Sequence, residues 1–371
     1  MESSNEKNME VNSGGHDTPQ SEQPDDQTRS RRKKLPIVLV IAIDVLLAAL
    51  LLGIFYIVQY EIQPEVQGEP LPAPTPVAQV QPSAPPAESS APAAAPDAAP
   101  DVTEPAEETP APSPTIDPND WRAKFADKFT DGEVVSTDTS YKSANVSIEI
   151  QTFTRDNVPY YIADIYVADI NYFRTAFAKK ADVMGSSELT DKVARANDAI
   201  LAINGDHCKS GTLVRNGLLY RKPKAGLDVL VMYNDGSMKT FSPDDFDVDS
   251  TLASGVYQTW SFGPMLLQNG QAMTEFNSTV QRNNPRTAIG YYEPGHYCFV
   301  VIGGRLRGRS LGCTMQELSQ LMQELGCAEA YNLDGGKSSE MVFMDNVLNH
   351  QEGRRKTPDI VYITDNVEGQ P

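Results

Sequence analysis

The stretch AYNLDGGKSSEMVF, residues 330–343, places a polar loop between two short apolar segments. A plain hairpin would need only the turn. Glycine removes the Cβ and permits positive φ, so consecutive N–H groups can turn towards an anion. A lysine and serine hydroxyls add donors for phosphate or sugar oxygens. The loop is therefore either an ordinary turn or part of a binding site, and its candidate residues are Asn332, Asp334, Gly335, Gly336, Lys337 and Ser338.

Apolar, β-branched and aromatic runs bounded by turn residues surround this loop, which predicts many strands. Residues 215–217 (RNG), 234–236 (NDG) and 293–295 (EPG) have the composition of hairpin turns. Helical patterns occupy 120–129, 186–197 and 314–325, the last with Thr314 as N-cap, Glu317 three residues later and Gly326 after its end. We expect an α+β domain, a mixed β-sheet system with a few covering helices.

The N-terminal part predicts a membrane anchor. A polar tail, 1–34, ends in the basic run RSRRKK and precedes an almost wholly apolar segment within 35–60. Residues 36–58 would span ~34 Å as a helix, enough for a bilayer core of ~30 Å. The basic flank places the N-terminus in the cytoplasm and the C-terminal domain outside the cell. A cleaved signal peptide is the rival interpretation, but the long polar tail and long apolar run disfavour it.

Residues 61–117 have the composition of a linker, with 15 of the 27 prolines and no Lys or Arg. Such a segment predicts a disordered, semi-extended spacer between the anchor and the domain at 118–371. The spacer accounts for most of the formal net charge of −19. A mildly acidic domain without a basic face argues against a nucleic-acid partner.

All four cysteines, Cys208, Cys298, Cys313 and Cys327, lie in the C-terminal domain, and no two of them have C-x-x-C spacing. A zinc or thioredoxin-type site is therefore not expected. An exported domain with four cysteines permits two disulfides, and three pairings stay open.

Three further polar loops follow short apolar runs, the usual place for a site on a rigid scaffold. Residues 202–211 present Asn204, Gly205, Asp206 and His207, and residues 283–291 present Arg286. Residues 303–310 place Arg305 and two more arginines at alternating positions, suited either to a phosphate clamp or to a solvated edge. N-G is also a common turn dipeptide.

The segments AINGDHCKSGTLVRNGLLY, SFGPMLLQNG and RTAIGYYE…NLDGGKSSEMVF occur in an order that resembles the phosphodiester glycosidase family. The resemblance covers roughly residues 140–365. It implies a pocket formed by Asn204, Gly205, Asp206, Arg286, Asn332, Asp334, Gly335, Gly336 and Ser338. Two departures stand out. Family members often have D-G-R in place of residues 303–305, so an acid expected at position 304 is missing, and Lys337 replaces a third small residue.

The resemblance implies an extracellular hydrolase that cleaves the glycosidic bond of a sugar-1-phosphodiester of the N-acetylglucosamine type in a cell-envelope glycan. Asp334 and Asp206 are the expected catalytic pair, because carboxylates suffice to stabilise an oxocarbenium-like transition state and activate water. Arg286, with Lys337 or Arg305, would hold the phosphate. These carboxylates could instead hold a divalent cation. The alternatives are a non-catalytic glycan-binding module and an exopolysaccharide assembly protein.

Overall fold

The computed structural model describes residues 36–60, 68–71, 117, 119–179, 185–304, 311–349 and 353–367. The chain forms two compact units, Met1–Ile62 and Gln63–Pro371. In the first, α1 (Ile37–Tyr60) is one continuous 24-residue helix. Its window Ile37–Ile54 is long and apolar enough to cross a membrane, and none of that window is buried. A helix with these properties fits a membrane anchor or a signal sequence.

The second unit is built on a nine-stranded sheet whose neighbours are all antiparallel. Antiparallel order follows from the short turns between consecutive strands, such as the EPG turn between β15 and β16. In spatial order the strands are β14 (Gln271–Ala272), β13 (Met265–Gln268), β17 (Glu329–Asn332), β15 (Arg286–Glu293), β16 (His296–Ile302), β5 (Val158–Val167), β4 (Val146–Arg155), β3 (Ser140–Lys142) and β2 (Val135–Thr137).

A five-stranded antiparallel sheet packs against it, in the order β19 (Asn346–Val347), β18 (Met341–Phe343), β7 (Leu201–Asn204), β20 (Asp359–Ile363) and β6 (Phe173–Phe177). Two three-stranded sheets complete the unit, one of β11 (Met238–Phe241), β10 (Val229–Tyr233) and β12 (Val256–Trp260), the other of β1 (Glu69–Pro70), β9 (Leu218–Arg221) and β8 (Leu213–Arg215). Short 3₁₀ turns occupy Ile170–Tyr172 and Gly336–Ser338. Every strand pair among the described residues is antiparallel, whereas we expected a mixed sheet.

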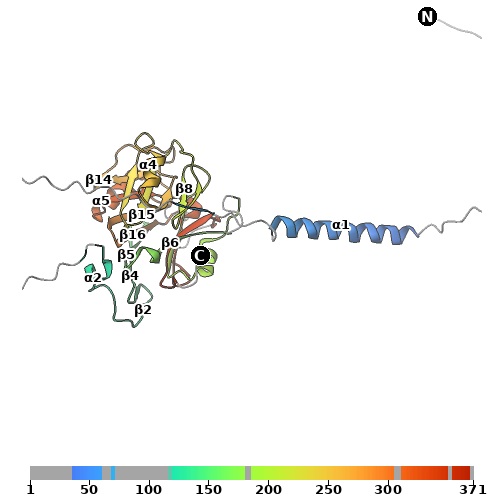
Figure 1. The fold of residues 1–371 in the computed structure, drawn as a ribbon, viewed down its shortest axis with the longest axis horizontal. Helices are drawn as coiled ribbons and strands as arrows, with labels where there is room; N and C mark the ends of the chain where they lie inside the picture. Colours follow the sequence, from blue (N-terminus) through green and yellow to red (C-terminus); the bar gives the residue numbers. More distant parts are fainter. Residues whose placement is uncertain are drawn as a thin grey trace, which may run out of the picture. The chain divides into compact units, whose positions relative to one another are not determined.

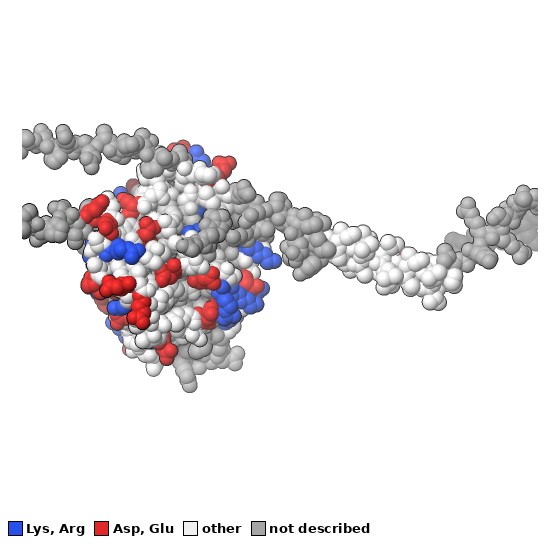
Figure 2. Space-filling model, turned by 60° about the horizontal axis from the view of Figure 1, so that its bottom comes forward, with Lys and Arg blue, Asp and Glu red and all other residues white. Residues whose placement is uncertain are grey.

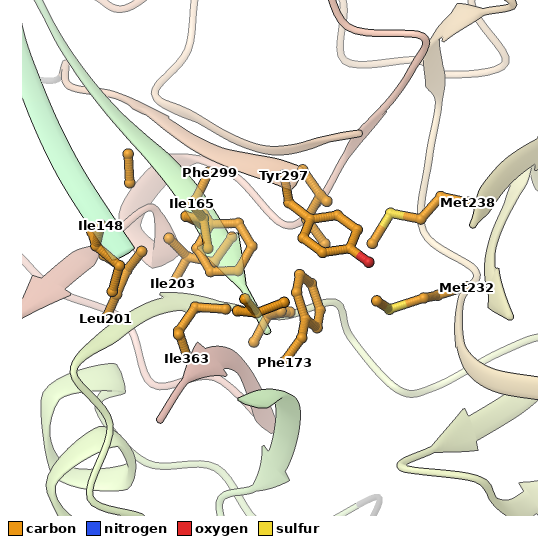
Figure 3. Packing of buried hydrophobic residues seen from close by; sticks show 14 of the residues in the cluster. Ile148, Ile165, Phe173, Leu201, Ile203, Met232, Met238, Tyr297, Phe299 and Ile363 are labelled. Carbon is orange, nitrogen blue, oxygen red and sulfur yellow. The ribbon is translucent and has the colours of Figure 1, made fainter. Parts of the chain in front are cut away.

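The main core lies between the two large sheets (Figure 3). On β16, Tyr297, Phe299 and Val301 face this core, whereas the alternate residues face a second cluster covered by α5 (Met315–Glu324). This two-sided burial explains why HYCFVVI is apolar without alternation. On the outer face of the five-stranded sheet lies α3 (Thr190–Ala196), and α4 (Val248–Ala253) packs near β10 and β12. The helices thus cover sheets, as an α+β domain requires (Figure 1).

The three hairpin turns are confirmed, since β8–β9, β10–β11 and β15–β16 pair as antiparallel neighbours. The helix ends of α5 are also confirmed: Thr314 and Glu317 form a reciprocal capping box, and Gly326 has φ +82°. The helix expected over 120–129 is short, α2 (Trp121–Lys124), because the chain leaves helical geometry at Phe125. The helix expected from 186 begins at Thr190.

Two features concern the expected linker and surface. Most of residues 61–117 lies outside the described residues, but β1, within that range, pairs with β9 and places Leu71 against an apolar cluster. On the face shown in Figure 2, acidic side chains are spread over the second unit, and basic side chains lie at several separate places among them, with the largest gathering at the right. That face carries no continuous basic surface.

Candidate active site

The loop after β7 is joined to the loop after β17 through the buried side chain of Asn204. Its Nδ2 donates to the Asp334 carbonyl at 2.8 Å, and its Oδ1 accepts from Thr287 Oγ1 at 2.8 Å and from the Glu340 amide at 3.2 Å. A single amide therefore connects three separated stretches of sequence. Asn204 ends β7 of the five-stranded sheet, whereas Thr287 lies on β15 of the nine-stranded sheet.

Asn332 connects the F-G-P stretch in the same way. Its backbone N–H donates to the Pro264 carbonyl at 3.1 Å and its Nδ2 to the Gly263 carbonyl at 2.8 Å. The N-G-D, F-G-P, R-T-A-I-G and N-L-D-G-G stretches of the family resemblance therefore meet in one region. Asn204 and Asn332 are buried and hold the loops together rather than facing outward.

Asp334 is the centre of the region. Arg355 Nη2 contacts its two carboxylate oxygens at 2.8 and 2.6 Å, and His207 Nε2 lies 3.2 Å from Oδ2. The Asp334 side chain is 8% exposed, whereas those of His207 and Arg355 are 45% and 51% exposed. The carboxylate thus sits beneath two accessible polar groups. A ligand reaching it from solvent would meet both of them first.

The charge state of Asp334 follows from these contacts. Burial raises its pKa, but the hydrogen bond and charge of His207, a hydrogen bond from Ser338 and the charge of Arg355 outweigh burial, and the pKa falls below its ordinary value. Arg355 Nε also donates to Ser338 Oγ at 2.7 Å. Asp334 is therefore ionised at neutral pH and is held in one orientation.

The two glycines after Asp334 have separate structural reasons. A Cβ on Gly335 would lie 2.8 Å from the Pro285 carbonyl oxygen, so the position requires a close backbone approach. Gly336 has φ +68° and donates its N–H to the same carbonyl at 2.8 Å. Lys337 is exposed, and its carbonyl accepts from the Arg355 amide at 2.9 Å. The glycines therefore bring the Asp334 loop against the N-terminal end of β15.

Asp206 lies on the neighbouring loop but its carboxylate is engaged below the surface. Oδ1 accepts from the Cys208 amide at 2.7 Å and from Arg215 Nη2 at 3.2 Å, and Oδ2 accepts from the Ser261 amide at 3.2 Å. Asp206 is 3% exposed. His207, the next residue, is the side chain from this loop that contacts Asp334. The expected Asp206–Asp334 pair is thus a His207–Asp334 pair in this geometry.

Arg215 fixes this arrangement from within. Its guanidinium is 2% exposed and donates to Asp359 Oδ2 from Nε at 3.2 Å and from Nη2 at 2.9 Å, besides Asp206. Burial, reinforced by the Asp206 charge, raises the pKa of Asp359 to about 7. A Cβ on Gly205 would lie 2.2 Å from Asp359 Oδ1, so only glycine fits there.

The ligand atoms of Asp206, Cys208 and Asp359 lie within 4.8 Å of one another. This donor set fits a divalent cation poorly, for two reasons. The Arg215 cation already bonds to both carboxylates, and burial raises the pKa of the Cys208 thiol well above its ordinary value, which disfavours the thiolate that a metal would need.

Arg286 is buried, and its guanidinium donates to three backbone carbonyls: to Cys313 from Nε at 3.3 Å, to Val280 from Nη1 at 3.0 Å and to Arg282 from Nη2 at 2.6 Å. These bonds tie the loop before β15 to the segment before α5. The expected phosphate role of Arg286 therefore competes with a structural one. Arg305 lies outside the described residues.

The backbone around residues 303 and 304 leaves no room for the acid that the family pattern has at position 304. A Cβ on Gly304 would lie 2.7 Å from the Gly312 backbone nitrogen, and one on Gly303 would lie 2.6 Å from Pro159 Cγ. In this backbone neither position accepts a carboxylate.

Two cavities, of about 550 and 300 Å³, lie elsewhere and are lined by none of His207, Asp334 and Arg355.

Sequence reasoning missed Arg355, Arg215 and Asp359, and it gave His207 no role. The run GRRKTP, residues 353–358, was the available signal for Arg355, but it has the composition of any charged loop. Arg215 belongs to the R-N-G hairpin and was assigned only to that turn.

The model of the phosphodiester glycosidase family matches residues 191–364. The resemblance expected from the sequence is confirmed. The matched segment contains both site loops, from β7 and β17, and Arg355. The family match supports a glycosidase-type function and suggests a hydrolase.

Among curated proteins, an SPbeta prophage-derived uncharacterized protein, YomE of Bacillus subtilis (strain 168), is 28% identical over 170 residues, 43% of this chain. The chain spans about a quarter (26%) of that protein's length. Among solved structures, the catalytic domain of zebrafish N-acetylglucosamine-1-phosphodiester alpha-N-acetylglucosaminidase, auto-inhibited by its pro-peptide, has a TM-score of 0.48 at 17% identity, covering 64% of this chain and 86% of that chain. A hypothetical protein from Synechocystis has a TM-score of 0.44 at 13% identity, covering 60% and 62%.

Proposed function

We propose that the chain is a membrane-anchored extracellular hydrolase that cleaves the glycosidic bond of a sugar-1-phosphodiester, of the GlcNAc-α-1-phosphodiester type, in a cell-envelope glycan. The observation that carries the proposal is the ionised Asp334 carboxylate held between two accessible groups, His207 and Arg355. The family match over residues 191–364 supports the reaction class. The apolar α1 supports the anchor.

In the proposed reaction Asp334 faces the anomeric carbon and stabilises the positive charge that develops on the sugar ring. The leaving phosphate is already anionic, so a strong general acid is less necessary than for an ordinary glycoside. His207 donates from Nε2 to Asp334, 3.2 Å away, so in its neutral form the other ring nitrogen, Nδ1, would take the proton of the attacking water. Arg355, with Lys337 beside it, would hold the phosphate oxygens by charge-assisted hydrogen bonds.

Asp206 has a different place in this mechanism from the one expected. Its oxygens hold the Cys208 and Ser261 amides and Arg215, so we propose that it positions the loop that carries His207. The alternative function, a glycan-binding module without turnover, is favoured by one observation: Arg355 already occupies both oxygens of Asp334.

One experiment separates these functions. The full chain, purified in detergent, is incubated with a GlcNAc-α-1-phosphodiester in H₂¹⁸O, and the products are analysed by mass spectrometry. A glycosidase releases GlcNAc carrying ¹⁸O and a phosphomonoester without it. Label in the phosphate would identify a phosphodiesterase instead. Saturable binding without product would support the glycan-binding module and overturn the hydrolase.

A further inference from the structure

Two buried cysteines lie side by side outside the candidate active site. Cys298 lies on β16, and Cys327 lies between α5 and β17, and the two side chains are almost completely buried. Their sulfur atoms are 3.7 Å apart. A disulfide needs an S–S distance of about 2.05 Å, so closing this gap takes a movement of roughly 1.7 Å shared between two side chains.

The residue between them explains why the sulfurs meet. Gly290 on β15 pairs with Cys298 on one side and with Ala330 of β17 on the other. A Cβ at Gly290 would lie 2.6 Å from Cys298 Sγ and 2.7 Å from Cys327 Sγ. The two sulfurs therefore fill the space that a side chain on the middle strand would take.

The surroundings distinguish this pair from the other two cysteines. Cys208 contacts the Arg215 guanidinium at 3.7 Å, and Cys313 lies beside Arg286, so each of those has a cation for a neighbour. A mutual hydrogen bond and burial raise the pKa of the Cys298 thiol well above its ordinary value. Cys298 is therefore poorly suited to supply a thiolate ligand to a metal.

We infer that Cys298 and Cys327 form a disulfide bond in the exported protein. Formation removes one proton from each thiol and transfers two electrons to a disulfide of the extracytoplasmic compartment, protein-borne or of low molecular weight, which leaves as two thiols. The bond would tie β16 to the end of α5 across β15 and fix the entry to β17, which leads to the Asp334 loop. This inference rests on the proposed export but is independent of the proposed hydrolysis.

The test is disulfide mapping of the full chain, isolated without reductant from the membranes of cells that export it. Thiols are blocked with N-ethylmaleimide in acidic denaturant. Trypsin alone leaves Cys313 and Cys327 on one peptide, residues 310–337, so a protease specific for glutamate is added to cut after Glu317 and Glu324. We expect a peptide pair joined through Cys298 and Cys327, with maleimide on Cys208 and Cys313. Maleimide on both Cys298 and Cys327, or a bond from either to another cysteine, overturns the inference.

A second measurement uses a matched control. Reductant should lower the thermal midpoint of the wild type and of Cys313→Ser by roughly 5–10 °C, because both retain the cross-link. The midpoint of Cys298→Ser should not respond to reductant. An equal response of Cys298→Ser and Cys313→Ser would contradict the inference.

Discussion

Replacing Arg355 with alanine should separate substrate binding from stability. The guanidinium contacts both oxygens of Asp334 and Ser338 Oγ, within 2.6–2.8 Å. About half of the Arg355 side chain is exposed (51%), so solvent screens the ion pair. The buried Asp334 carboxylate keeps its contacts with His207 and the Gly335 amide when Arg355 is removed, so the loss of this screened pair should cost only about 1 kcal/mol. The thermal midpoint of Arg355→Ala should therefore lie within a few degrees of wild type.

The kinetic effect should be larger. If Arg355 holds the substrate phosphate, its loss removes charge-assisted hydrogen bonds worth ~1.5–3 kcal/mol. At ~1.4 kcal/mol per factor of ten, kcat/KM for a GlcNAc-α-1-phosphodiester should fall by about 10- to 150-fold. An aryl N-acetylglucosaminide, which has no phosphate, should lose several-fold less. The assay follows sugar release from both substrates by the full chain.

Arg354→Ala provides the matched control. Arg354 bonds to Asp191 and to the buried Glu340, and none of its ion pairs among the described residues reaches Asp334. Its loss leaves the Glu340 carboxylate buried without that partner and should lower the free energy of unfolding by about 1–3 kcal/mol. kcat/KM of the folded protein should stay near wild type. The reasoning is refuted if Arg354→Ala loses as much kcat/KM as Arg355→Ala, or if the latter loses none.

Three further predictions concern the scaffold. The pKa of Asp359 is raised to about 7 in the folded protein, so between pH 4 and 7 the folded state binds more protons at this residue than the unfolded state. The contribution of Asp359 to stability is therefore present below pH 4 and is lost as the pH rises to 7. Thermal unfolding should show that the difference in midpoint between wild type and Asp359→Asn shrinks from pH 5 to pH 7.5. Gly335→Ala should destabilise the protein by about 1–3 kcal/mol in urea titrations, whereas Gly226→Ala, with nothing within 4 Å, should change it little. Thr314→Ala should cost about 1 kcal/mol by the same measurement, and no change would contradict the capping role.

Local patterns predicted the parts of the fold whose causes are local. The RNG turn needs positive φ, and Asn216 and Gly217 adopt it at 51° and 79°. The Thr314 capping box is equally local. In contrast, β1 was not expected, because its pairing with β9 joins residues about 150 positions apart and Glu69–Pro70 lies in a stretch with linker composition.

The site was predictable only in part, for a similar reason. Asp206 and Asp334 are both acids that follow a strand. The residues beside them in the sequence do not show that the Asp206 carboxylate pairs with the buried Arg215 whereas the Asp334 carboxylate faces outward. The difference comes from partners far along the chain: Arg355, 21 residues beyond Asp334, and Asp359, 144 residues beyond Arg215. Gly335 was the more informative signal, since the close approach to Pro285 is what brings the loops together.

The central claim is that Asp334 carries the reaction, and turnover by Asp334→Asn tests it most directly. The substitution keeps the side-chain size but removes the negative charge that faces the sugar. We predict that sugar release from a GlcNAc-α-1-phosphodiester falls by at least about 100-fold, while Asp244→Asn, at an exposed acid in the loop before α4, keeps wild-type turnover. Full turnover by a folded Asp334→Asn chain would contradict the account.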